Sequence, residues 1–168
     1  MSVFNPVEAY RTFQTIPPSS GGLVASISSG LYFSMKYVNK AYAVINIGQG
    51  GVETYAITPY QATAVAGTGA KTLSTSVDIW VSSSRADAPT HRTPATTFTT
   101  STSTGALPHP KQVIFEIDPG LAMDINNGFD CLDIQVTASC SEANVSAYFL
   151  LDMRYKEYPG QFVRLTSD

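Results

Sequence analysis

The residues of this chain best suited to acid–base chemistry are its two histidines, His91 and His109. Both lie in a proline-bearing segment, where His91 could join Asp87 and a nearby serine in a nucleophilic triad. The candidate serines are Ser82, Ser83 and Ser84. No Gly-x-Ser-x-Gly elbow accompanies them, and a metal site on the two histidines would need carboxylates from elsewhere. We therefore expect solvated histidines and no catalytic, cofactor or metal site.

Paired carboxylates are the minimum requirement for most glycoside hydrolysis. The acids available for such a pair are Glu116, Asp118, Asp130 and Asp133. Nothing in the sequence brings two of them to the required separation in a cleft. We expect exposed acids on strand faces instead.

Calcium binding is an alternative for the segment from Asp124 to Asp130, where oxygen-bearing side chains occur at alternate positions. Gly128 replaces the third ligand, and Gln135 stands where a bidentate Glu would close the site. An Asn-Gly turn explains the same residues. The sequence favours the turn and leaves calcium open.

Phosphate and nucleic-acid binding are disfavoured. Gly48–Gly51 is rich in glycine, but it opens no helix and has no following Lys and Ser or Thr, so it predicts a tight hairpin loop. No stretch clusters Lys and Arg, and the isoelectric point is near 5.2. A polyanion would meet no basic surface, so we expect no direct nucleic-acid partner.

The two cysteines, Cys131 and Cys140, are nine residues apart on what the alternation predicts to be one strand. A straight strand would separate them by ~30 Å, whereas a disulfide needs their Cα atoms within about 7 Å. We expect free thiols.

Alternating apolar and polar residues near the C-terminus predict two long strands, each with one apolar face. The first has its apolar residues at Leu132, Ile134, Val136, Ala138 and Cys140. The second has them at Val145, Ala147, Phe149, Leu151, Met153 and Tyr155, against Ser146, Tyr148, Leu150, Asp152, Arg154 and Lys156. The short link between them has hairpin length, so we expect antiparallel neighbours.

Strand signals recur along the rest of the chain between Gly, Pro and Asn residues. They predict strands over Leu23–Ile27, Leu31–Val38, Ala41–Ile47, Val52–Ile57, Leu73–Val81 and Gln112–Ile117, with a further apolar run over Leu121–Ile125. Turns are expected at Asp118–Gly120 and Asn126–Gly128. The fold class predicted is all-β: an antiparallel β-sandwich, jelly-roll-like, with about eight to ten strands.

A length of 168 residues fits a single domain, 1–168. The segment Pro17–Gly22 separates off residues 1–22, which could act as an extended N-terminal arm. Ser82–Pro110 is long and rich in proline, and such a segment is usually functional or ordered by a partner. In the alternative interpretation, Ala95–Thr102 forms a Thr-rich edge strand between two loops.

Charged residues make up only 14% of the chain, whereas about 25% is typical. Charge depletion is characteristic of surfaces that contact other proteins, although Thr-rich β-domains can be charge-poor without such contacts. No run reaches the ~18 apolar residues of a membrane helix, and Met1–Pro6 does not resemble a signal peptide. We expect synthesis in a cytoplasm and no membrane partner.

The absence of a signal peptide, the short extended N-terminus, the Thr/Ser/Ala/Gly-rich strands and the few charges and cysteines together resemble the small β-sandwich structural proteins of virions. The likeness extends over the whole chain and is strongest to capsid decoration, minor capsid or tail-associated proteins of bacteriophages. It implies a non-enzymatic virion structural protein that assembles in many copies and binds or cements neighbouring capsid subunits. The implied partners are other virion proteins and further copies of the chain, with the N-terminal segment and Ser82–Pro110 as contact elements.

A carbohydrate- or receptor-binding β-sandwich module is the alternative function. Such a module would stack exposed aromatic side chains on sugar rings. The candidates are Tyr32, Tyr37, Tyr60 and Trp80.

Overall fold

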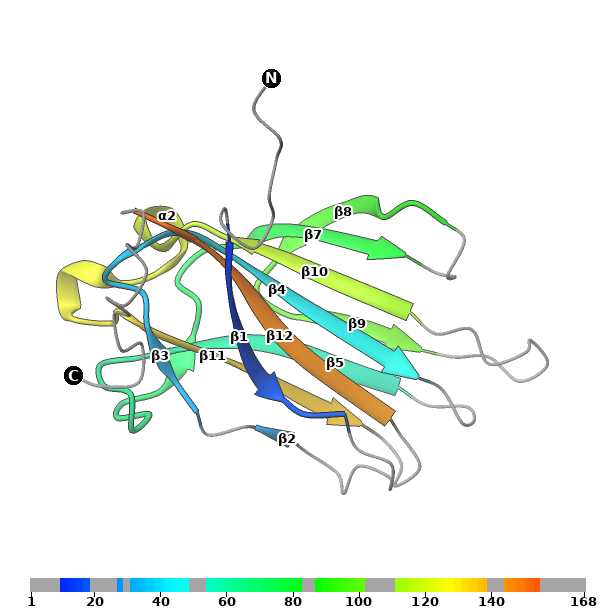
Figure 1. The fold of residues 1–168 in the computed structure, drawn as a ribbon, viewed down its shortest axis with the longest axis horizontal. Helices are drawn as coiled ribbons and strands as arrows, with labels where there is room; N and C mark the ends of the chain where they lie inside the picture. The colour runs from blue at the N-terminus through cyan, green and yellow to red at the C-terminus, as the bar shows by residue number, and fades with distance from the viewer. Residues whose placement is uncertain are drawn as a thin grey trace.

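Two antiparallel sheets pack face to face in the computed structural model, which describes residues 10–18, 27–28, 31–48, 54–82, 87–101, 111–138 and 144–154 (Figure 1). Sheet A has the order β1-β12-β4-β10-β7-β8. Its strands are β1 (Tyr10–Ile16), β12 (Asn144–Met153), β4 (Val38–Gly48), β10 (Lys111–Ile117), β7 (Val77–Ser82) and β8 (Thr90–Ala95).

Sheet B is built around the pair β11 and β5, with shorter strands on either side. Its strands are β2 (Ile27–Ser28), β3 (Phe33–Ser34), β11 (Cys131–Ala138), β5 (Thr54–Ala62), β6 (Lys71–Thr72) and β9 (Phe98–Ser101). β2 and β3 both pair with β11, and β6 and β9 both pair with β5.

The order of pairing defines the topology. Strands of the first half pair in reverse order with strands of the second: β1 with β12, β3 with β11, β4 with β10, and β5 with β9. The chain is thus one long nested hairpin rolled into two sheets, which is the arrangement of a jelly roll. β7 and β8 are additions that widen sheet A beyond β10. The predicted all-β antiparallel sandwich is confirmed, but the described residues form twelve strands, more than the eight to ten expected, because several short strands pair at the sheet edges.

Alternation along the strands explains the core. The predicted apolar faces of β11 and β12 are buried at Leu132, Ile134, Val136, Ala138, Val145, Ala147, Phe149 and Leu151. Facing strands contribute the same kind of row, for example Val113, Phe115 and Ile117 on β10. Period-two side chains from both sheets therefore interdigitate in one layer.

Two predicted hairpins are wrong. β11 lies in sheet B and β12 in sheet A, so they are not neighbours, and the same holds for β4 and β5, which the loop beginning at Gly48 connects. The physical reason is that sheets stack ~10 Å apart, and the five residues that link each pair of strands are long enough to cross that distance as well as to close a hairpin. Alternation marks a buried face without saying which strand lies beside it.

Residues 1–22 were predicted to form an arm, and part of that segment belongs to a sheet. Tyr10–Ile16 is β1, which pairs with β12 from Tyr10 to Ile16, while residues 1–9 and 19–22 lie outside the described residues. In Ser82–Pro110, β8 was not predicted, but the Thr-rich edge-strand interpretation is confirmed by β9 on β5.

The apolar run Leu121–Ile125 does not form a strand. Asp118, predicted as part of a turn, caps the short helix α2 (Pro119–Ala122) by accepting a hydrogen bond from the Gly120 backbone N–H. The 3-10 turn η1 (Ile125–Asn127) follows and ends at Gly128, whose φ of 83° requires glycine or asparagine. Figure 1 shows α2 and η1 together at one end of the sandwich.

Candidate functional site

The predicted histidine chemistry does not assemble among the described residues. His91 Nε2 lies 3.0 Å from Asp78 Oδ1, and its ring packs edge-on against Trp80 at 4.9 Å between centroids. Both side chains of this pair are about half exposed, at 46% and 53%. Ser82 instead donates its hydroxyl to the backbone carbonyl of Asp87, at 3.0 Å. His109, Ser83 and Ser84 lie outside the described residues.

The four candidate carboxylates are dispersed. Glu116, on the outer face of sheet A, pairs with Lys40 at 2.6 Å, and this hydrogen bond is the main cause of a raised Lys40 pKa. Asp118 caps α2, and Asp130 Oδ1 accepts a weak hydrogen bond from the Cys131 thiol at 3.4 Å.

Asp133 corrects the expectation of exposed acids. It is only 1% exposed, and its Oδ1 accepts a hydrogen bond from Thr15 Oγ1 at 2.8 Å. Burial of a carboxylate requires such partners. The alternation predicted a solvent-facing side chain at this position, but it could not show that Thr15 of β1 covers it.

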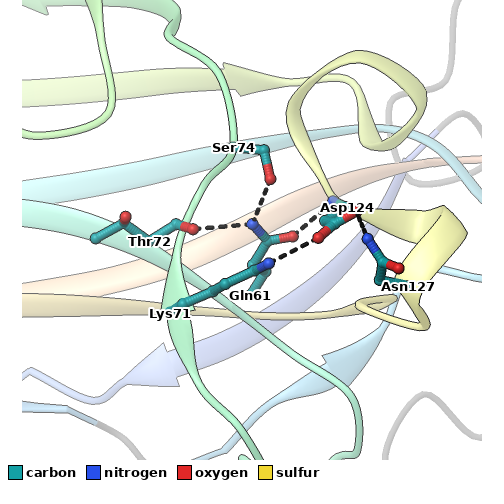
Figure 2. A network of polar contacts seen from close by, with 6 residues as sticks. All are labelled: Gln61, Lys71, Thr72, Ser74, Asp124 and Asn127. Carbon is teal, nitrogen blue, oxygen red and sulfur yellow. Dashed lines mark hydrogen bonds and ion pairs between the residues drawn. The ribbon is translucent and has the colours of Figure 1, made fainter.

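The candidate calcium turn is held by a lysine. Asp124 Oδ2 accepts a hydrogen bond from the Lys71 ammonium at 2.7 Å, and its Oδ1 accepts one from the Asn127 side-chain amide at 2.7 Å (Figure 2). Phe129 stacks on the same ammonium, 3.8 Å from Nζ to the ring centroid. Across the described residues, no group of three or more His, Cys, Asp or Glu side chains could hold a metal ion.

Gln61 anchors this network to the core. It is fully buried, and its amide nitrogen donates to the carbonyl of Thr72 and the hydroxyl of Ser74, at 2.8 and 3.0 Å. Its amide oxygen accepts the backbone N–H of Asp124 at 2.7 Å (Figure 2). All polar atoms of the buried side chain are therefore satisfied, and the η1 turn is tied to β5 and β6.

The Lys71–Asp124 ion pair changes the pKa of Asp124. The hydrogen bond from Lys71, followed by the one from Asn127, lowers the pKa of Asp124 below its usual value. Asp124 is therefore ionised at neutral pH and balances the lysine charge. The network of Gln61, Lys71, Asp124 and Asn127, which we call the clamp, therefore holds the η1 turn in place by hydrogen bonds and one ion pair.

The clamp presents an apolar tip. We call residues Asp118–Asp130, which contain α2 and η1, the end loop. Leu121 is 75% exposed and Ile125 is 41% exposed, although the backbone around them is fixed. Thr75 Oγ1 donates to the Leu121 carbonyl at 2.8 Å, and Ser74 N–H donates to the Ala122 carbonyl at 2.9 Å.

The outer face of sheet A carries a second apolar feature, which we call the outer row. The register aligns one side chain from each of four neighbouring strands: Tyr148 on β12, Val44 on β4, Ile114 on β10 and Trp80 on β7. Leu150 and Tyr42 are aligned immediately beside it. This face points away from the core. The outer face of a sandwich sheet normally carries polar side chains, so an apolar row across it is unusual.

Val44 shows how closely the outer row is packed. It is only 3% exposed although it belongs to the outer face, and it is the smallest side chain of the row. The next aligned residues are uncharged and polar: Gln112 donates to Asn46 Oδ1 at 3.0 Å. The outer row and its polar neighbour together form a band without an ionised side chain between β12 and β7.

The candidate sugar-binding aromatics are scattered. Tyr32 is buried, and burial, followed by the charge of Asp133, raises its pKa. Tyr60 is half-buried on β5, Tyr37 is exposed in the turn before β4, and Trp80 belongs to the outer row. Cys131 is buried and is not part of a disulfide among the described residues. Cys140 lies outside the described residues, so the expected pair of free thiols stays a prediction.

The outer row and the end loop were missed by sequence reasoning. A signal for the row existed, because Tyr148 and Leu150 sit on the face of their strand predicted to be polar. Only the register between strands, which the sequence does not encode locally, shows that they meet Val44 and Ile114. No helix in the described part of the chain is long and apolar enough to cross a membrane. No family model, curated protein or solved structure matches this chain.

Proposed function

We propose that this chain is a non-enzymatic structural protein of a virion, which assembles in many copies and binds or cements neighbouring capsid subunits. The observation that carries the proposal is the outer row. Apolar side chains from four adjacent strands are aligned on the face of sheet A that points away from the core. Apolar surface gains free energy when another protein covers it.

Two further features support the proposal. The jelly roll is an architecture that viral capsid domains share with lectins and cupins, which is support by analogy of fold. The low charge content of 14% suits a surface that is covered in an assembly. The proposed location is the virion, after synthesis in the host cytoplasm, and the proposed partners are virion proteins and further copies of this chain, with no direct nucleic-acid or membrane contact.

The carbohydrate alternative receives less support from the same residues. Stacking on sugar needs an accessible aromatic face, but Tyr32 is buried and the Trp80 ring packs against His91. Trp80 fluorescence would report either kind of contact, because it is the chain's single tryptophan.

The mass of the full chain in solution tests the proposal. Light scattering and sedimentation velocity of the purified protein, at concentrations from about 1 to 100 μM, should show a defined multi-copy species, and electron microscopy should show symmetric particles. A strict monomer over that range would contradict the proposal. A monomer whose Trp80 fluorescence changed on addition of sugars would favour the carbohydrate module instead.

A further inference from the structure

Asn127 is the only asparagine of the chain that is followed by glycine. The others, which precede larger residues, are Asn5, Asn39, Asn46, Asn126 and Asn144. An Asn-Gly pair is the sequence most prone to deamidation, because glycine has no side chain to hinder attack of its backbone nitrogen on the asparagine side chain. Asn127 and Gly128 are both exposed, so water reaches them. The η1 turn therefore carries the intrinsically most reactive asparagine of the sequence.

Deamidation at this position needs no enzyme and no reagent besides water. The Gly128 backbone nitrogen gives up its proton and attacks Cγ of Asn127. A new C–N bond forms, the Cγ–Nδ2 bond breaks, and the leaving nitrogen takes up the proton and departs as ammonia. Water then opens the resulting succinimide ring at either carbonyl carbon, which leaves aspartate or isoaspartate at position 127.

The folded turn keeps the two reacting groups apart. Gly128 N–H donates to the Ile125 carbonyl at 2.9 Å, and Asn127 Nδ2 donates to Asp124 Oδ1 at 2.7 Å (Figure 2). The 3-10 conformation turns the Gly128 nitrogen away from Cγ of Asn127, so ring closure requires rotation about the Asn127 Cα–C bond. That rotation breaks the bond to Ile125, and the Asn127 side chain must also leave Asp124.

Asp124 restrains Asn127 from an anchored position. Its Oδ2 accepts a hydrogen bond from Lys71 at 2.7 Å, and its backbone N–H donates to the buried Gln61 at 2.7 Å (Figure 2). Its backbone carbonyl accepts hydrogen bonds from the N–H groups of Asn127 and Phe129, at 3.0 and 3.2 Å. The clamp thus fixes both the side chain and the backbone on which deamidation depends.

We propose that Asn127 is a deamidation site whose reaction the clamp controls. Conversion is slow while Asp124 holds the Asn127 amide and fast once that bond is lost. The product carboxylate cannot donate to Asp124 and repels it. Isoaspartate also lengthens the main chain by one carbon, which disrupts the hydrogen bonds of the 3-10 turn. Each conversion therefore opens the end loop of that molecule permanently.

Peptide mass spectrometry of the full chain, incubated in mildly alkaline buffer, measures the conversion of each asparagine. In guanidinium chloride, Asn127 should react faster than every other asparagine. In the folded chain its reaction should be slower than in the denatured chain by about 10-fold or more, because it requires local opening of the turn. Equal rates at Asn127 in the two states would overturn the protection, and faster reaction of another asparagine in the denatured chain would overturn the choice of site.

Asp124→Ala tests whether the clamp is the cause. It removes the acceptor for the Asn127 amide, so conversion in the folded chain should rise about 3- to 10-fold. Glu116→Ala is the matched control, because it removes an ion pair with a lysine of similar exposure, Lys40, outside the clamp. Circular dichroism checks the fold, and Lys71→Met replaces Asp124→Ala if that variant does not fold, since it removes the other bond to the Asp124 carboxylate. An unchanged rate in the clamp variant, or an equal rise in Glu116→Ala, would overturn control by the clamp.

Asn127→Asp tests the effect of the product. This variant places the aspartate product opposite Asp124, so its thermal unfolding midpoint should be lower than that of the wild type. Asn126→Asp is its control, because it adds the same charge one residue away and keeps the Asn127–Asp124 bond. Equal midpoints in the two variants would overturn the opening of the end loop by deamidation.

Discussion

Thr15 and Asp133 join the two sheets of the sandwich. Thr15 on β1, in sheet A, donates its hydroxyl to the carboxylate of Asp133 on β11, in sheet B, at 2.8 Å, and both side chains are buried. The register of β1 with β12 shifts between Gln14 and Ile16, so Thr15 occupies a bulge. A bulge redirects its side chain, which explains how a strand at the edge of one sheet reaches the other.

Thr15→Val should therefore destabilise the fold. Valine keeps the shape but removes the donor to Asp133 Oδ1, and the loss of one partner of a buried hydrogen bond costs about 1–3 kcal/mol. Urea denaturation at neutral pH measures the free energy of unfolding. Thr58→Val is the control, because the Thr58 hydroxyl bonds Thr97 at 3.0 Å on the exposed surface, and its loss should cost about 0.5 kcal/mol or less. Equal losses in the two variants would show that the Thr15 bond has no special role.

The Lys71–Asp124 pair should make stability depend on acid pH. The pKa of Asp124 is lowered in the folded chain, first by Lys71 and then by Asn127. Its contribution is therefore fully present above the unfolded pKa, near 4, and is lost as the pH falls through the lower folded pKa. A double-mutant cycle with Lys71→Met and Asp124→Asn, measured by urea midpoint, should show coupling at pH 7 that declines towards pH 2.5. Coupling that is constant over this range would contradict the assignment.

Gly67 and Gly128 both have positive φ, so alanine substitutions at these two positions compare the cost of backbone strain with the cost of an added steric clash. Gly67 has φ 78°, and a Cβ there would lie 2.8 Å from Cε2 of Tyr32, whereas Gly128 has φ 83° and open space around its Cβ position. Gly128→Ala should cost about 1 kcal/mol for the left-handed conformation alone. Gly67→Ala should cost clearly more, because the buried Tyr32 ring must also move. Thermal unfolding of the two variants compares them directly, and equal melting temperatures would count against the Tyr32 contact.

The fold class could be predicted from the sequence because burial in a sandwich follows period two within each strand. The apolar positions of β12, such as Phe149, are therefore correct. Pairing could not be predicted, since it depends on partners far away in the chain: Phe149 lies opposite Phe13 and Ala43. The same limit explains the two hairpins that prove to be connections between sheets.

The candidate surfaces depend on pairing in the same way. Tyr148 and Trp80 are more than sixty residues apart in sequence and share a row only because β4 and β10 lie between them. Leu121 was predicted to lie in an apolar run and is exposed, because Asp118 and Pro119 start a helix in which only Pro119 and Ala122 are buried. The order of apolar and polar residues within one segment does not show which strands will pair or which apolar run will be buried.

The aromatic cluster at Phe33 gives the last prediction. Phe33 is fully buried on the short strand β3, and its ring centroid lies 4.9 Å from that of Phe13 and 4.7 Å from that of Phe149. These three side chains come from β1 and β12 of sheet A and β3 of sheet B, so Phe33 fills the space between the sheets at the β1 edge. Phe33→Ala should cost about 3–5 kcal/mol, since it removes packing and leaves a cavity.

Phe13→Ala is the comparison for that variant. Phe13 touches the same ring but is only partly buried, so its neighbours and water can fill part of the space it leaves. We expect a loss smaller than that of Phe33→Ala, measured as the free energy of unfolding in urea for both variants. A loss at Phe13 equal to or greater than the loss at Phe33 would mean that the β1 edge, and not the short β3 strand, supplies the main packing between the sheets there.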